Sequence, residues 1–253
     1  MEILWGAAVR YVLSAQVGGA CAAEGLDRLL GRWRAHLRSV SGTADADTAA
    51  LVTWPSRDIS GVRALLGHGM QPLTVIAARL AHRAVPPSRS GAKIRPAGPG
   101  DIAEVLALHM TEYHYDVHFG GAVHRPRASA VLRAEMERAL RSPGGWRWLA
   151  EVDGRPAGLL LAEPPEGAGW VAPLTGLAPA AYLSCLSVAP AQRDRGVGGD
   201  LVTRLHAELD RRAVAVTLLH HGQLNPLSTP FWYRMGYRPL WTIWEARPAG
   251  ALR

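Results

Sequence analysis

The sequence predicts a mixed α/β fold with a mixed sheet, in which a shorter N-terminal piece precedes a longer α/β domain. From residue 93 onward, segments with strand and helix periodicity follow one another in the order βααββ and then βαβαβ. A stretch rich in Pro, Ser and Gly at residues 84–92 separates this part from the residues before it. We therefore expect one domain over residues 1–83, a linker over residues 84–92 and a second domain over residues 93–253.

The elements of the second domain have local signals. Apolar residues at helical spacing predict its helices, and Asp153-Gly154 between two strand-like runs is a strong hairpin signal. In order, we expect a strand at 93–95, a helix from 101 to about 110, a helix at 128–140, strands at 146–152, 157–162 and 181–188, a helix at 198–212, a strand at 214–220, a short helix near 231 and a strand at 240–244.

The N-terminal piece contains a segment that resembles part of the second domain at a constant offset of 167 residues. The apolar residues 49–52 fall on residues 216–219 at this offset. The polar and special matches are Asp58 with Asn225, Gly69 with Gly236, Pro72 with Pro239, and Leu73 with Leu240. Both copies predict strand, short helix, glycine turn and strand, from about residue 49 to residue 80 in the first copy. An internal duplication explains the matches, and two unrelated βαβ units are the alternative.

A duplication would make the N-terminal piece only half a domain. At this offset it has no counterpart to residues 93–167. Half a sheet leaves an open strand edge, and exposed edges invite further pairing. We therefore expect the piece to dock on the second domain or on another subunit, as in a homodimer.

Composition and charge exclude several classes of protein. The formal net charge is +7, but the basic residues are scattered and include one lysine, Lys93, so no clustered basic face for nucleic acid is predicted. Glu2 and Arg10 interrupt the apolar N-terminus, and no stretch is long enough to span a membrane. Two widely separated cysteines, Cys21 and Cys185, predict neither a disulfide nor a metal site. These features favour a cytoplasmic protein.

The segment over residues 182–201 carries the clearest chemical signal. A strand ends at Val188, Pro190 breaks it, and a loop rich in Arg and Gly leads into a helix at about Gly198. Backbone N–H groups in such a turn point inward, and the helix N-terminus adds partial positive charge. Gly196 and Gly198 allow the main chain to approach a phosphate closely. The pattern predicts a pyrophosphate-binding loop.

Two other phosphate-binding loops do not fit. The Walker pattern requires Gly-Lys-Ser/Thr, and this loop has no lysine. The dinucleotide-binding fingerprint requires three glycines directly after the strand, whereas Pro190 and an arginine-containing loop intervene here.

A strand, Leu-x-Val-x-Pro and Arg-x-x-Gly-x-Gly opening a helix resemble the signature of the GNAT superfamily of N-acetyltransferases. The matching residues are Leu186, Val188, Pro190, Arg193, Gly196 and Gly198, followed in family order by Asn225 and residues 231–237. The resemblance covers about residues 93–247. The N-terminal piece is similar to the C-terminal half of the same family, so the chain resembles tandem members with one degraded copy.

This resemblance implies a GNAT-like acyltransferase fold, acetyl-CoA as co-substrate and no metal. The acceptor would be an amine on a small molecule or peptide. Main-chain groups of Leu186 and Val188 would pair with the pantetheine arm, and the Leu186 amide would polarise the thioester carbonyl. The implied cofactor-binding residues are Leu186, Ser187, Val188, Arg193, Asp194, Arg195, Gly196, Val197, Gly198, Gly199 and Asn225.

The chain departs from the family pattern at the catalytic positions. Trp232 stands where the family has a tyrosine that protonates the thiolate, and Tyr233 lies one position away. Tyr233 is therefore the candidate catalytic residue. The strand at residues 182–188 has no carboxylate that would serve as general base. A rival function follows from these departures, namely an acyl-CoA-binding sensor or interaction protein with weak or no catalysis.

Other polar residues are candidates for contacts with the acceptor. Asp116 and Tyr182 are the expected substrate residues, and Glu112 is an alternative partner for a substrate ammonium group. His220 and His221 end a strand, where they would act as a base or simply be hydrogen-bonded. The N-terminal copy has no Arg-x-x-Gly-x-Gly loop, so we expect no CoA there.

Overall fold

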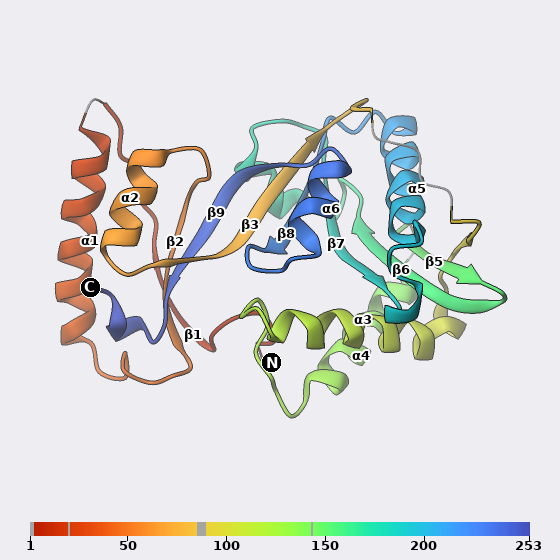
Figure 1. Ribbon diagram of the computed structural model, residues 1–253, viewed down its shortest axis with the longest axis horizontal. Coiled ribbons are helices and arrows are strands. Elements are labelled where there is room, and N and C mark those ends of the chain that lie inside the picture. Colours follow the sequence, from red (N-terminus) through yellow and green to blue (C-terminus); the bar gives the residue numbers. More distant parts are fainter. Residues whose placement is uncertain (1–2, 20, 85–89, 143) are drawn as a thin grey trace.

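The computed structural model of the chain describes residues 3–19, 21–84, 90–142 and 144–253. Most of the expected linker, residues 85–89, lies outside the described residues. Within the described parts, one mixed nine-stranded sheet runs through the molecule and carries helices on both sides (Figure 1). None of the described helices has the length and apolar content that a membrane crossing requires.

The sheet has the strand order β1-β2-β9-β3-β8-β7-β6-β5-β4. The strands are β1 (Val9–Leu13), β2 (Thr48–Pro55), β3 (Gln71–Leu80), β4 (Lys93–Pro96), β5 (Trp146–Val152), β6 (Arg155–Glu163), β7 (Ala180–Val188), β8 (Val216–Gly222) and β9 (Arg238–Ala246). The pairs β1–β2 and β7–β8 are parallel, and the other neighbours are antiparallel.

The helices form separate groups along the sheet. They are α1 (Ala22–Ser39), α2 (Ile59–Gly67), α3 (Ile102–Val117), α4 (Ala128–Arg141), α5 (Val197–Arg211), α6 (Ser228–Arg234) and the short 3₁₀ helix η2 (Gly169–Leu174). Helices α1 and α2 lie together at the end of the molecule formed by β1 and β2 (Figure 1). Alternate residues of β6 face opposite sides: Leu160 packs in the α5 core, whereas Leu159 and Leu161 pack in the core of α3 and α4.

The two parts of the chain exchange strands. β3, from the N-terminal piece, lies between β9 and β8, and β9 lies between β2 and β3. The N-terminal piece therefore docks on the rest of the chain through main-chain ladders. The fold also confirms the strand, helix and strand expected in this piece, as β2, α2 and β3.

The register of the exchanged strands repeats at an offset of 167 residues. Ala50 pairs with Ala246 in the β2–β9 ladder, and the positions 167 residues after and before them, Thr217 and Arg79, pair in the β8–β3 ladder. Where the two exchanged strands meet, Val75 pairs with Thr242. These ladders are therefore related by a pseudo-two-fold arrangement centred on the β3–β9 contact.

Matched residues in the two segments also have the same local roles. Asp58 accepts a hydrogen bond from the Gly61 amide at 3.1 Å and caps α2. Asn225 accepts from the Ser228 amide at 3.3 Å at the start of α6. Both patterns satisfy amide groups that the start of a helix leaves without intrahelical acceptors. After the two helices, Gly69 and Gly236 have φ of 77° and 88°, a region that favours glycine.

Side chains add a polar clamp between the N-terminal piece and the second part. Arg125 donates to both carboxylate oxygens of Asp47, at 2.6 and 2.8 Å. Arg247 adds a contact to Asp47 at 3.3 Å. Together they hold the pKa of Asp47 at about 2, mainly through the Arg125 hydrogen bond. Nearby, the Val123 amide donates to the carbonyl of the buried Leu4 at 2.9 Å.

The element order expected for the second part is confirmed throughout, with boundaries that differ by a few residues. The largest difference is α3, which continues to Val117 and so carries Glu112 and Asp116 on an ordered helix. The sequence reasoning did not predict β1, α1 or η2.

Candidate functional site

Strands β7 and β8 separate in the middle of the sheet. Their parallel ladder ends with Leu183 opposite Leu219, whereas β7 remains paired with β6 as far as Val188. A register shift that skips Ser184 marks the point where β7 leaves β8. Among the described strands, nothing pairs with the β8-facing edge of the last part of β7. Its main-chain groups therefore face an opening, where an extended ligand is able to bind as an added strand.

The loop after β7 has the geometry of an anion-binding turn. Asp194 and Gly196 have positive φ, 60° and 86°, and α5 begins immediately afterwards at Val197. The first amides of a helix have no intrahelical acceptors, so the turn and the helix start present N–H groups to an anion. The loop is therefore suited to hold a phosphate.

A cavity of about 720 Å³ connects the opening with this loop. Of the cofactor-binding residues expected from sequence, all but Arg195 line it: Leu186, Ser187, Val188, Arg193, Asp194, Gly196, Val197, Gly198, Gly199 and Asn225. Arg195 is exposed outside it. We call this space the loop cavity.

Two of these residues have side-chain roles that the sequence did not indicate. The Ser187 hydroxyl is buried and donates to the Leu108 carbonyl at 2.6 Å, which ties β7 to α3. Asn225 is also buried, and besides capping α6 it donates to the Asp116 carboxylate at 3.2 Å. Asn225 therefore links the loop cavity to α3.

A second cavity of about 1160 Å³ adjoins the loop cavity. Its wall includes Trp5, Arg10 and Leu73 from the N-terminal piece, together with Trp170 of η2 and Glu163 of β6. Both parts of the chain thus contribute to this space, which we call the composite cavity.

Six residues line both cavities and define their junction. They are Glu112, Asp116, Ser184, His220, His221 and Gly222. Three elements meet there: α3 supplies the two carboxylates, β7 supplies Ser184, and β8 supplies the rest. A group held in the loop cavity and a group held in the composite cavity would meet at this junction.

The junction carboxylates are poorly solvated. Burial, reinforced by the neighbouring Asp116 carboxylate, raises the pKa of Glu112 to about 8. Burial also raises the pKa of Asp116, against the lowering effect of the hydrogen bond from Asn225. Two close carboxylates in such a place do not ionise together easily, so one of them holds a proton near neutral pH.

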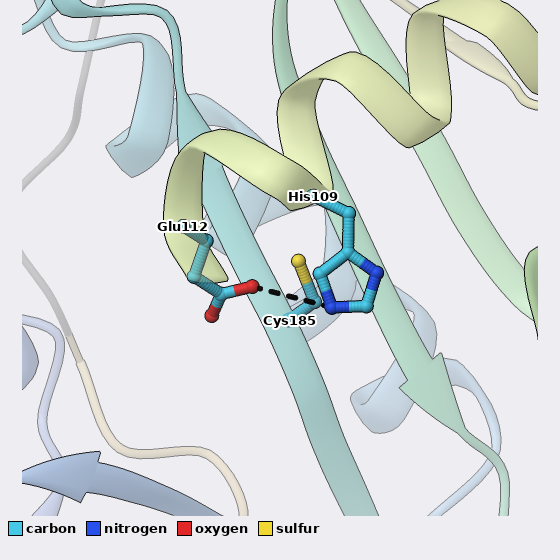
Figure 2. Close-up of side chains that lie close together, drawn as sticks. All are labelled: His109, Glu112 and Cys185. Atoms are coloured by element: carbon cyan, nitrogen blue, oxygen red, sulfur yellow. Dashed lines mark ion pairs between the residues drawn. The ribbon is translucent and has the colours of Figure 1, made fainter. Parts of the chain in front are cut away.

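Glu112 belongs to a compact cluster with His109 and Cys185, whose side chains converge between α3 and β7 (Figure 2). Their potential ligand atoms lie within 4.8 Å of one another, and His109 Nε2 is 3.6 Å from Glu112 Oε2. Burial lowers the pKa of His109 to about 4 and raises that of the Cys185 thiol. At neutral pH the histidine is therefore neutral and the cysteine is a thiol. These three residues are the ones among the described residues that are placed to hold a metal ion.

Tyr182, one of the expected substrate residues, lines the composite cavity. Its hydroxyl lies 3.0 Å from His220 Nδ1, and its ring packs edge-on against Trp170 with centroids 4.6 Å apart. Burial raises the pKa of Tyr182 and lowers that of His220 to about 4, so both are neutral near pH 7. His220 is thus a hydrogen-bonded wall residue and not a cation.

The structure does not place Tyr233, the expected catalytic residue, at either cavity. Its side chain is 36% exposed, and the Arg238 guanidinium lies over its ring at 5.7 Å. Trp232, one position earlier, is buried and lines the loop cavity. The rotation of about 100° between neighbouring helix positions explains why the two side chains point apart.

Sequence reasoning missed the convergence of α3 with β7 and β8. Glu112 and Asp116 are one helical turn apart, so they share a face of α3, and that spacing was the available signal. The contribution of Trp5 and Arg10 to the composite cavity had no signal, because it depends on how the N-terminal segment folds back.

Comparisons with known proteins agree with this geometry. The model of the Acetyltransferase (GNAT) family matches residues 105–237, more than half of the chain. No curated protein is significantly similar to the chain in sequence.

Several solved structures are similar to it. A GCN5-related N-acetyltransferase from Sphaerobacter thermophilus superposes with a TM-score of 0.64 at 16% identity, over 95% of this chain and 74% of that one. The PaiA N-acetyltransferase from Thermoplasma acidophilum, in complex with coenzyme A, has a TM-score of 0.48 at 13% identity, over 62% of this chain and 98% of that one.

The mixed sheet, the loop before α5 and the family match lead to the same assignment. The chain belongs to the GNAT family of acetyltransferases.

Proposed function

We propose that the chain transfers an acetyl group from acetyl-CoA to an amine held in the composite cavity. The observation that carries this proposal is the junction. The unpaired part of β7 runs from the phosphate-binding loop to Ser184, where the loop cavity opens into the composite cavity. A thioester extended along β7 would present its acyl carbon at that opening.

The chain offers a binding group for each part of acetyl-CoA. Amides of Val197, Gly198 and Gly199 at the start of α5 would hold the pyrophosphate. The main chain of Leu186 and Val188 would pair with the pantetheine arm, and the Leu186 amide would polarise the acyl carbonyl. No bound metal is needed for these contacts.

The composite cavity favours an amine as the acceptor. Carboxylates of Asp116, Glu163 and Glu245 line it, and Tyr182 with Trp170 adds aromatic wall. Carboxylates and aromatic rings attract an ammonium group, so Asp116 and Tyr182 are the residues proposed to hold it. A protein that only senses acyl-CoA would not require a second cavity that meets the first at the acyl position.

We further infer that the N-terminal piece is a degraded second copy of the GNAT half domain. The shared register of the β2–β9 and β8–β3 ladders supports this. In this copy, β1 is paired with β2 along all five of its residues, so no opening corresponds to the one between β7 and β8. We expect no CoA there. The unpaired Cys21 and Cys185 suit the reducing cytoplasm that we propose for the reaction.

Two measurements test the proposed function. Calorimetry should give one acetyl-CoA site per chain. Release of the CoA thiol, followed over a panel of small amines, polyamines and peptides, should then show turnover with at least one amine class. Binding without turnover across the whole panel would favour a sensor, and absence of binding would contradict both functions.

A further inference from the structure

We propose that Glu112 is the catalytic proton carrier of this site, taking a proton from the attacking amine and passing it to the CoA thiolate. The proposal rests on the proposed acetyl transfer. It assigns the acid–base role to α3, since β7 has no carboxylate and Tyr233 faces away from both cavities.

The position of Glu112 meets the geometric requirement. Its carboxyl group lies at the junction, where the loop cavity and the composite cavity meet. The Leu186 amide, the group proposed to polarise the acyl carbonyl, acts as a hydrogen-bond donor to Glu112 in this ligand-free structure. A carbonyl oxygen that accepted from the same amide would therefore lie beside the Glu112 carboxyl.

Glu112 is also freer to exchange a proton than the other junction carboxylate. Asp116 already accepts a hydrogen bond from Asn225 at 3.2 Å. Glu112 Oε2, in contrast, is buried and has no hydrogen-bond partner within the described structure. A buried carboxyl oxygen without a partner is costly unless it is protonated or meets a donor, and an incoming amine is such a donor.

The surroundings of Glu112 set its proton affinity. The titratable groups that face it are His109 and Asp116 of α3, Tyr182 and Cys185 of β7, and His220 and His221 of β8. Burial lowers the pKa of all three histidines, so at neutral pH they are not cations that would hold Glu112 ionised. Its pKa of about 8 lies near that of a thiol, about 8.5, which permits proton exchange in both directions.

The proposed step balances as follows. The neutral amine nitrogen bonds to the acyl carbon, and one N–H proton passes to the Glu112 carboxylate. The C–S bond then breaks, its electron pair stays on sulfur, and the proton moves from Glu112 to the thiolate. The amide and CoA leave, and the carboxylate is restored.

The first test needs no acceptor. If acetyl-CoA takes the Leu186 amide away from Glu112, the carboxyl group loses a donor and its proton affinity rises. Calorimetric titration of acetyl-CoA at pH 8, in two buffers of different ionisation enthalpy, should show proton uptake by the wild type and none by Glu112→Gln. Glu104→Gln, on the same helix but outside both cavities, should behave like the wild type. Equal proton uptake in wild type and Glu112→Gln would overturn the proposal.

Kinetics give the second test. Glu112→Gln should lower kcat about 100-fold or more, with little change in the KM for acetyl-CoA. The rise of kcat/KM through pH 8, expressed per neutral amine, should disappear in this variant because the carboxylate that it reports is gone. Retention of both the rate and the pH step would overturn the assignment, as would activity that chelators remove and Zn²⁺ restores, which would make His109, Glu112 and Cys185 metal ligands. If the wild type itself bound no acetyl-CoA, the proposed function would fail first.

Discussion

Val75 of β3 pairs with Thr242 of β9 at the centre of the contact between the two exchanged strands. The two residues are 167 positions apart, the same offset that relates Asp58 to Asn225 and Gly69 to Gly236. Each strand is thus the last strand of its own β-α-β unit, yet it lies beside the first strand of the other. The N-terminal piece is therefore part of the sheet that carries the site.

Removal of residues 1–92 should prevent the second part from folding. Without β3, the edges of β8 and β9 lose the ladder between them, and buried residues such as Ala77 leave the core. We expect the remaining chain to be aggregated or to lack a cooperative thermal transition, as measured by circular dichroism. Restored solubility on co-expression with residues 1–92 would be the matching control. A folded, monomeric fragment that binds acetyl-CoA would contradict this account.

Gly198→Asp should abolish acetyl-CoA binding without unfolding the protein. A Cβ at this position would lie 3.4 Å from Phe231 and Val188, which is ordinary contact. The added carboxylate would face the pyrophosphate, and like charges brought together cost several kcal/mol. We expect at least a 100-fold loss of affinity by calorimetry and a nearly unchanged melting temperature. Gly198→Ala, which adds the Cβ alone, should lose much less. Unchanged affinity in a folded Asp variant would exclude the loop as the phosphate site.

Tyr233→Phe should leave turnover within about 2-fold of the wild type, far below the 10²–10⁴-fold effect of losing an acid–base group. The side chain is partly exposed and lies outside both cavities. Phenylalanine keeps a ring for Arg238, so stability should change by less than ~1 kcal/mol. Turnover with the best amine and thermal melting would be compared. A stable variant with a 10-fold or larger loss of turnover would return Tyr233 to the catalytic machinery.

Asp47→Asn should weaken the docking of the N-terminal piece in a pH-dependent way. Because Arg125 holds the pKa of Asp47 at about 2, below the unfolded value of about 3.9, its contribution is present above pH 4 and is lost as the pH falls through 2. The carboxylate is 35% exposed, so solvent screening limits the expected loss at pH 7 to about 1 kcal/mol. Urea unfolding at pH 7 and pH 2 measures it. A loss as large at pH 2 as at pH 7 would rule out the ion pair as its cause.

Much of the local structure was predictable from the sequence. The 167-residue offset located β2, α2 and β3, because Asp58 and Gly69 have local roles, a helix cap and a left-handed turn, that do not depend on distant contacts. The glycines and arginines after β7 identified the anion-binding loop for the same reason: its geometry is set by a few adjacent residues.

Non-local features were not predictable in this way. Whether β9 pairs with β8 or with β3 depends on competition between whole strands, and the apolar patterns of both strands suit either neighbour. The role of Glu112 depends on α3 packing against β7, and its raised pKa is a property of that burial. The same holds for Trp5 and Arg10, which reach the composite cavity only through the folded N-terminal segment.

Amide hydrogen exchange with and without acetyl-CoA tests the central claim most directly, since it locates the co-substrate without requiring an acceptor. The account predicts slower exchange at the amides of Leu186 and Val188 on the open edge of β7, and of Val197 to Gly199 at the start of α5. It predicts no direct protection in β1 or α1 of the N-terminal copy. Binding that left the β7 and α5 amides unchanged, or that protected the N-terminal copy instead, would contradict it.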